Sequence, residues 1–151
     1  MIAWCKSLLR KLRPTGGVES TSAQPDDPDA EIREVFLAEL NDVAQSLKHA
    51  CAEWRANPAD QAALKTIRRG FHTLKGSAPL VGASALSEFS RHLEKLAIQV
   101  LEKPLPVTPD ILNTVEQAIG LLPAFAISIR DSRPPPPMVR AIGHRAQRFL
   151  G

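Results

Sequence analysis

The chain has few aromatic residues and no tyrosine. Only 5% of its 151 residues are aromatic, whereas 44% are hydrophobic, with Ala and Leu abundant. Because sheets are enriched in aromatic and β-branched residues, this composition favours helices packed on helices. Alternating apolar runs joined by Asn-Gly or Asp-Gly, the usual signal of a β-hairpin, are also missing. The length suits one domain of ordinary size, so we expect a single all-α domain.

Cysteines and long apolar runs are equally scarce. The two cysteines, Cys5 and Cys51, cannot form a disulfide framework and lack metal-ligand spacing. Cys51 falls among apolar helix positions, which predicts a buried free thiol suited to a reducing cytosol. The longest apolar stretch, AIGLLPAFAISI, is much shorter than the ~20 residues of a membrane-spanning helix. The opening MIAWCKSLLRKLR is a poor signal peptide, and we expect a cytoplasmic protein.

An excess of basic charge is absent from the middle of the chain, although the net charge is +3. Residues 29–131 carry 11 Lys and Arg against 13 Asp and Glu, whereas the flanking segments carry 8 against 3. The basic excess therefore lies in the tails, so we expect no nucleic-acid binding by the folded part. The tails are only weakly amphipathic, and we do not expect them to contact a membrane.

Helix-start signals recur at three places, as a capping residue followed by proline. These are Asp27-Pro28, Asn57-Pro58 and Thr108-Pro109, each with an acidic residue in the first turn. With a softer start after Gly82, they predict helices at 28–55, 58–80, 84–102 and 109–130. Apolar residues recur every three or four positions in each. Because short connections make successive helices antiparallel neighbours, we expect an antiparallel up-down four-helix bundle with flexible N- and C-terminal tails.

Composition also predicts the domain organisation. Residues 1–27 form a basic segment and a flexible linker rich in Gly, Ser, Thr and Pro. Residues 28–131 form the bundle. Residues 132–151 begin with the proline-rich DSRPPPPMVR and continue as a basic tail.

The second predicted helix contains an unusual cluster of cations around a histidine. In RRGFHTLKGSAPLVGA, which begins at Arg68, the residues three and four positions from His72 are Arg68, Arg69, Lys75 and Gly76. The three cations repel one another and favour the neutral imidazole, which is a nucleophile. A phosphoryl group on that ring would turn the repulsion into attraction. Gly76 weakens the helix but leaves open space through which another protein could reach the ring.

The segment FHTLKGSAPLVGA closely resembles the acceptor motif of histidine-containing phosphotransfer (HPt) domains. That motif reads His-x-Leu-Lys-Gly-Ser, with a glycine six residues on. The resemblance covers residues 29 to about 131 and is strongest to the HPt domains of chemotaxis-type kinases in type IV pilus systems. The matching positions here are His72, Leu74, Lys75, Gly76, Ser77 and Gly82.

The resemblance implies a role for each matched residue. His72 would be phosphorylated, Lys75 would hold the phosphoryl oxygens and Gly76 would admit the partner. Glu94 would accept the N–H of the second ring nitrogen, with Glu88 as the alternative for this role.

One residue departs from the family pattern. Pro79 disfavours helical geometry at Ala78 and cannot donate to the carbonyl of Lys75, so the helix end and the position of Ser77 are expected to be altered. The other histidines, His49, His92 and His144, show no metal-site spacing, and we expect no bound metal.

These features together predict a phosphocarrier rather than an enzyme, although the chain could be a segment of a histidine kinase. It would pass a phosphoryl group between His72 and a kinase catalytic domain, or the aspartate of a response-regulator receiver domain. The chain has no Gly-rich nucleotide loop and no acidic pair for Mg²⁺, so it should hold no cofactor of its own, and Mg²⁺ should come with the partner. We expect a monomer. The alternative is a structural or adaptor helical bundle with basic tails that is never phosphorylated.

Overall fold

The structure is a computed structural model that describes residues 28–102 and 106–150. These residues form helices and no strand, which confirms the all-α prediction. The predicted segment 1–27 lies outside the described residues. The elements are α2 (Pro28–Ala56), α3 (Gln61–Ser77), the 3-10 turn η1 (Ala78–Val81), α4 (Ser84–Glu102), α5 (Pro109–Gly120), α6 (Leu122–Arg130) and α7 (Met138–Phe149).

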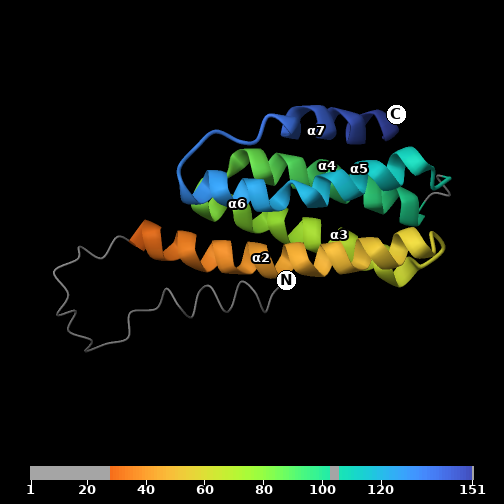
Figure 1. The fold of residues 1–151 in the computed structure, drawn as a ribbon, viewed down its shortest axis with the longest axis horizontal. Helices are drawn as coiled ribbons and strands as arrows, with labels where there is room; N and C mark the ends of the chain where they lie inside the picture. Colours follow the sequence, from red (N-terminus) through yellow and green to blue (C-terminus); the bar gives the residue numbers. More distant parts are fainter. Residues whose placement is uncertain (1–27, 103–105, 151) are drawn as a thin grey trace.

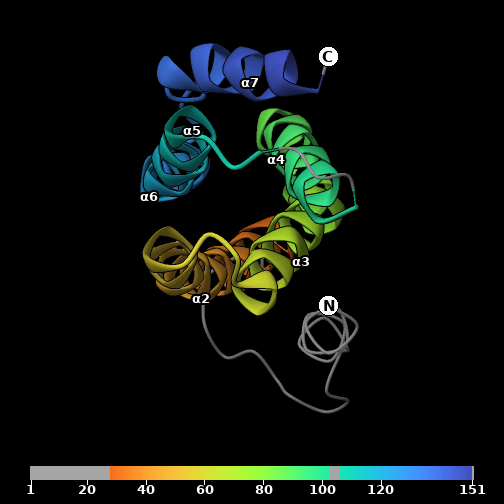
Figure 2. The ribbon, with the colours of Figure 1, turned by 90° about the vertical axis from the view of Figure 1, so that its right-hand side faces the viewer.

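α2, α3, α4 and then the α5–α6 pair run in alternating directions along the molecule (Figure 1). α3 packs between α2 and α4, and α5 and α6 return along α2. Seen along the helices, α2 and α3 lie side by side, with α4 above α3 and the α5–α6 pair above α2 (Figure 2). The helices enclose one core, to which each of them contributes.

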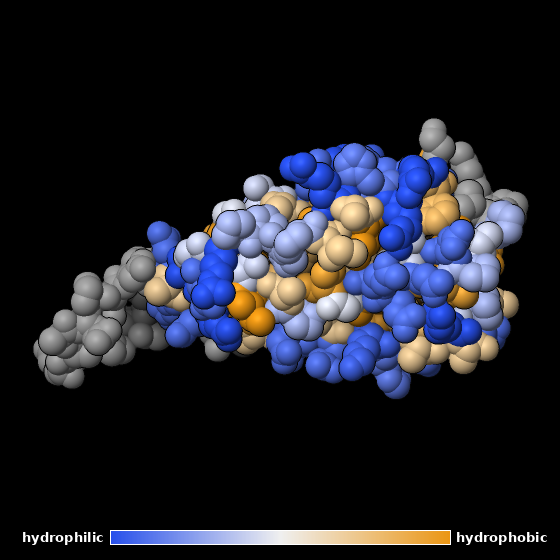
Figure 3. All heavy atoms as spheres, turned by 45° about the horizontal axis from the view of Figure 1, so that its top comes forward, coloured by the Kyte–Doolittle hydropathy of each residue, from blue (hydrophilic) through white to orange (hydrophobic). Residues whose placement is uncertain are grey.

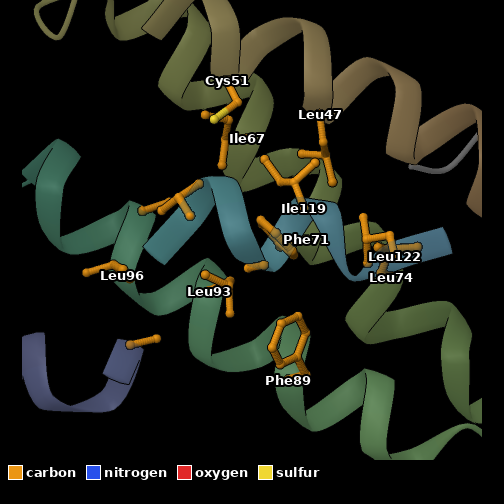
Figure 4. Close-up of a cluster of buried hydrophobic side chains, with 14 of the residues drawn as sticks. Leu47, Cys51, Ile67, Phe71, Leu74, Phe89, Leu93, Leu96, Ile119 and Leu122 are labelled. Atoms are coloured by element: carbon orange, nitrogen blue, oxygen red, sulfur yellow. The ribbon is translucent and has the colours of Figure 1, made fainter. Parts of the chain in front are cut away.

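The core is aliphatic, with a few large aromatic rings. Phe71 of α3, Leu93 of α4 and Ile119 of α5 point toward one another at its centre (Figure 4). The ring of Phe89 meets that of Phe125 with centroids 5.3 Å apart. Cys51 is a buried free cysteine, as predicted, and burial, together with the nearby charge of Glu116, raises the pKa of its thiol to about 11.

The structure corrects the start of the second helix. Asn57-Pro58 does not begin α3, because Asn57 instead forms a turn in which its side chain accepts from the N–H of Ala59 at 3.2 Å. The helix begins three residues later, where the Asp60 carboxylate accepts from the N–H of Ala63 at 3.0 Å. The same signal does begin α5, where Thr108 caps the helix and Pro109 occupies its first turn.

The fourth predicted helix, 109–130, is divided in two. α5 ends at Gly120 and α6 begins at Leu122. Pro123 stands in the first turn of α6 and has no N–H, so it cannot continue the ladder of helical hydrogen bonds. The stretch Pro109–Arg130 is long and apolar enough to span a membrane by length and composition alone. In this structure its buried residues, including Val115 and Phe125, belong to the core.

The prediction of a flexible C-terminal tail is wrong for residues 138–149. They form α7, which lies across α4 and α5 (Figure 2). Ile142 and Ala146, one turn apart, are buried in that contact. With the top of Figure 1 turned forward, hydrophilic side chains cover much of the visible surface, with apolar residues between them (Figure 3). The small apolar stripe formed by Ile142 and Ala146 packs α7 against α4 and α5.

Gly70 allows the close approach of α2 and α3, a role that sequence reasoning did not assign. A Cβ at this position would lie 2.5 Å from Cδ2 of Leu47, a side chain that is fully buried. Any larger residue would require α2 or Leu47 to move. Gly70 thus fixes the separation of the two helices, two residues before His72.

Candidate functional site

His72 lies on α3 beside the buried stripe of that helix and not within it. Its neighbours Phe71, Thr73 and Leu74 are buried, whereas the His72 side chain keeps 40% of its surface exposed. The N-cap at Asp60 and the apolar residues of α3 hold this helix against α2 and α4. The imidazole therefore has one edge against the protein and one edge toward solvent.

The inner edge of the imidazole contacts α4. Nδ1 of His72 and Oε2 of Glu94 form a hydrogen bond. Glu94 is almost fully buried, with 7% of its side chain exposed. A carboxylate at Nδ1 favours the tautomer in which Nδ1 carries the proton, because the carboxylate can only accept. Nε2 is then left with its lone pair.

The charge of Glu94 is maintained despite its burial. Burial by itself would raise the pKa of this carboxyl, but hydrogen bonds from Lys75 and His72 outweigh burial and lower the pKa below its ordinary value. Glu94 is therefore an anion at neutral pH. The cations around His72 therefore surround a buried negative charge, that of Glu94.

Lys75 shares the same carboxylate. Its Nζ lies 2.6 Å from Oε1 of Glu94, and a third of the Lys75 side chain, 33%, is exposed. One carboxylate therefore holds both His72 and Lys75, which lie one turn apart on α3. The pairing positions the ammonium group beside the imidazole and leaves part of it open to solvent.

Gly76 opens the surface next to this group. A Cβ built at Gly76 would meet nothing within 4 Å, apart from the helix's own backbone. The glycine therefore serves no packing contact with the described residues, in contrast to Gly70. This agrees with the expectation that Gly76 leaves space near the ring.

The remaining residues of the motif are distributed around the acceptor turn. Arg68 and Arg69 are exposed and form no ion pair with residues in the described ranges. Ser77 is buried and ends α3, which stops there rather than at the predicted residue 80. The reason is Pro79, which has no N–H to continue the helix and lies in the first turn of η1. Gly82 ends η1 in the left-handed conformation, with φ of 70°.

Glu88 does not take the role offered as the alternative to Glu94. Its side chain is 68% exposed and lies 3.5 Å from Arg91 and 4.0 Å from His92, on a different face of α4 from Glu94. The register between α3 and α4 decides between the two acids, and a single sequence does not reveal that register.

The histidines other than His72 do not form a metal site with other described residues. Across residues 28–102 and 106–150, no group of three His, Cys, Asp or Glu side chains is placed to hold a metal ion. The amide Nε2 of Gln147 in α7 donates to Nε2 of the buried His92 at 3.3 Å, and His49 is exposed beside Glu53. Within the part of the chain that the structure describes, neither histidine contacts a buried carboxylate, as His72 does through Glu94.

The fold and the site define a class of protein, a helical bundle that presents an oriented, half-exposed histidine. The family model of the Hpt domain matches residues 31–125. The chain belongs to the Hpt domain family, and its role is histidine phosphotransfer in two-component signalling.

By name, one relative is a sensor histidine kinase and another is a chemotaxis protein. The chain is 30% identical over 102 residues to "Sensor histidine kinase CheAY" of Helicobacter pylori, a match that covers 68% of this chain and 13% of the relative. It is 29% identical over 86 residues to "Chemotaxis protein CheA" of Halobacterium salinarum, covering 57% of this chain and 13% of the relative. These matches confirm the resemblance to chemotaxis-type HPt domains. The chain spans only a small part of either relative, and no solved structure matches it.

Proposed function

We propose that His72 is the phosphorylated residue and that the chain acts as a phosphocarrier, not as a catalyst. The observation that carries the proposal is the contact of Glu94 with Nδ1, which leaves Nε2 on the half-exposed side of the ring. An orienting carboxylate on one ring nitrogen is the usual way to prepare the other nitrogen for reaction.

In the proposed step, the Nε2 lone pair attacks the phosphorus of an aspartyl phosphate on a receiver domain. An N–P bond forms as the P–O bond to the aspartate breaks, and the aspartate leaves as a carboxylate. The Nδ1 proton stays on the ring, where the negative charge of Glu94 offsets the positive charge that the imidazole acquires. Transfer to the receiver is the same step in reverse.

The cations around the ring would stabilise the phosphoryl group. Lys75 is held beside the imidazole by Glu94, and Arg68 and Arg69 are exposed one turn before His72 on α3. Positive side chains next to a phosphoryl group form charge-assisted hydrogen bonds to its oxygens. The open space at Gly76 would admit the surface of the partner, and the exposed Leu80 would contact that surface.

The partners we propose are a response-regulator receiver domain and a histidine kinase catalytic domain. Mg²⁺ and its ligands would come with the partner, because the sequence contains no Gly-rich nucleotide loop and no acidic pair to hold the metal. We further propose that the chain works as a monomer in the cytoplasm, a location that suits the buried free thiol of Cys51.

Labelling with phosphoramidate, a small phosphodonor, tests the proposal. The protein should gain one acid-labile, alkali-stable phosphoryl group, and His72→Gln should abolish it while the bundle stays folded. His49→Gln is the matched control, because His49 is exposed and pairs only with Glu53 on its own helix among the described residues. Labelling that persists in His72→Gln, or that is lost in His49→Gln, would contradict the assignment. A folded parent protein that is not labelled at all would favour the structural-bundle alternative.

A further inference from the structure

The main-chain hydrogen bonds of α3 have a defect one turn after His72. In an α-helix, the carbonyl of residue 75 accepts from the N–H of residue 79, which here is Pro79 and has none. The preceding bond is intact, since the N–H of Ala78 donates to the carbonyl of Leu74. The carbonyl of Lys75 therefore needs a donor from elsewhere, because an unpaired backbone acceptor in a partly buried position is unfavourable.

Ser87 supplies that donor. Its Oγ donates to the carbonyl oxygen of Lys75 at 2.8 Å, across the contact between α4 and α3. Ser87 is partly buried in the first turn of α4, and its own N–H continues the α4 ladder by bonding to Ala83. The hydroxyl thus takes the place of the missing N–H of Pro79.

The same face of α4 holds Lys75 at both ends. Ser87 and Glu94 lie seven residues apart, which is two helical turns and nearly the same direction from the helix axis. Ser87 fixes the main-chain carbonyl of Lys75, and Glu94 fixes its ammonium group together with the imidazole of His72. The two contacts set the position of the acceptor turn relative to α4.

We propose that Ser87 is a positioning residue for phosphotransfer, which replaces the hydrogen bond withheld by Pro79 and so holds the acceptor turn of α3 against α4. The inference rests on the proposed function of His72. Loss of the hydroxyl frees the Lys75 carbonyl and lets the turn that carries Lys75 and Gly76 shift. Small displacements of a positioned group are costly to transfer rates.

A four-protein cycle tests this inference: the parent chain, Ser87→Ala, Pro79→Ala and the double variant. Each is labelled with phosphoramidate at a temperature where circular dichroism shows it to be folded, and the initial rate of phosphohistidine formation is measured. Ser87→Ala should slow labelling by about 2- to 10-fold, the range equivalent to one typical hydrogen bond. In the Pro79→Ala background, where an N–H is restored to residue 79, removal of Ser87 should have much less effect.

Two further variants separate positioning from general destabilisation. Ser87→Thr keeps the hydroxyl and should label at nearly the parent rate. Ser84→Ala is the matched control, since Ser84 is exposed in the same turn of α4. A folded Ser87→Ala that labels at the parent rate would overturn the inference, as would an equal slowing in both backgrounds.

Failure of the proposed function gives a different result. A parent chain that phosphoramidate does not label at His72 would refute the phosphoacceptor assignment. The role of Ser87 is then read from the ¹⁵N signals of the His72 ring. Ser87→Ala should shift these signals and Pro79→Ala should restore them; unshifted signals would overturn the positioning role.

Discussion

Substitution of the two glycines on either side of His72 should have opposite effects on stability. Gly76→Ala adds a Cβ that meets nothing within 4 Å, so the free energy of unfolding should rise by up to about 1 kcal/mol, the difference in helix propensity between Ala and Gly. Gly70→Ala adds a Cβ 2.5 Å from a buried Leu47 atom. Overpacking of a core typically costs about 1–3 kcal/mol, which exceeds the gain in propensity, so this variant should be destabilised.

Urea unfolding followed by circular dichroism measures both effects. The rate of phosphotransfer from a protein partner should fall at Gly76, even though the stability rises. Gly76→Ala should slow labelling by a phosphorylated receiver domain, and Gly76→Leu should slow it further, whereas phosphoramidate should still label both at His72. A ratio of receiver labelling to phosphoramidate labelling that stays constant across Gly, Ala and Leu would refute the docking role of Gly76. A destabilised Gly76→Ala would refute the description of its surroundings.

Three further substitutions test other parts of the structure. Lys75→Ala should slow transfer and cost about 1–2 kcal/mol of unfolding free energy, because it removes a hydrogen bond to a buried carboxylate; an unchanged rate would mean that the lysine has no part in transfer. His92 has its pKa lowered, first by burial and then by Arg91, so the unfolded chain takes up a proton more readily and stability should fall as pH drops below the ordinary histidine pKa. In His92→Gln this loss between about pH 7 and 5 should be smaller, and an identical pH profile would contradict it. Ser132 adopts φ of 52° at the end of α6, so Ser132→Gly should stabilise the protein by about 0.5–1 kcal/mol, and a lower unfolding midpoint would contradict this.

Much of the fold could be predicted from the sequence because its signals are local. The helix starts at Thr108-Pro109 and after Gly82 depend on a few neighbouring residues, and both are found as predicted. The start of α3 was misplaced because two caps, Asn57 and Asp60, stand three residues apart. Local sequence does not say which of them the tertiary structure will use.

The parts that could not be predicted depend on contacts between helices. Gly70 is a packing glycine only because Leu47 of α2 faces it. The choice of Glu94 over Glu88, and the bond from Ser87 to the Lys75 carbonyl, follow from the register of α4 on α3. Docking of α7 was missed for a similar reason, since its narrow apolar stripe becomes a core element only where α4 and α5 leave a surface for it.

The most direct test of the account is the identity of the phosphorylated nitrogen. The ¹⁵N-labelled protein is treated with phosphoramidate, and the N–P bond is located by correlated ¹⁵N and ³¹P spectra. Because Glu94 occupies the Nδ1 side of the ring, the phosphoryl group should be on Nε2 of His72. A phosphoryl group on Nδ1 of His72, or on any other histidine, would contradict the account.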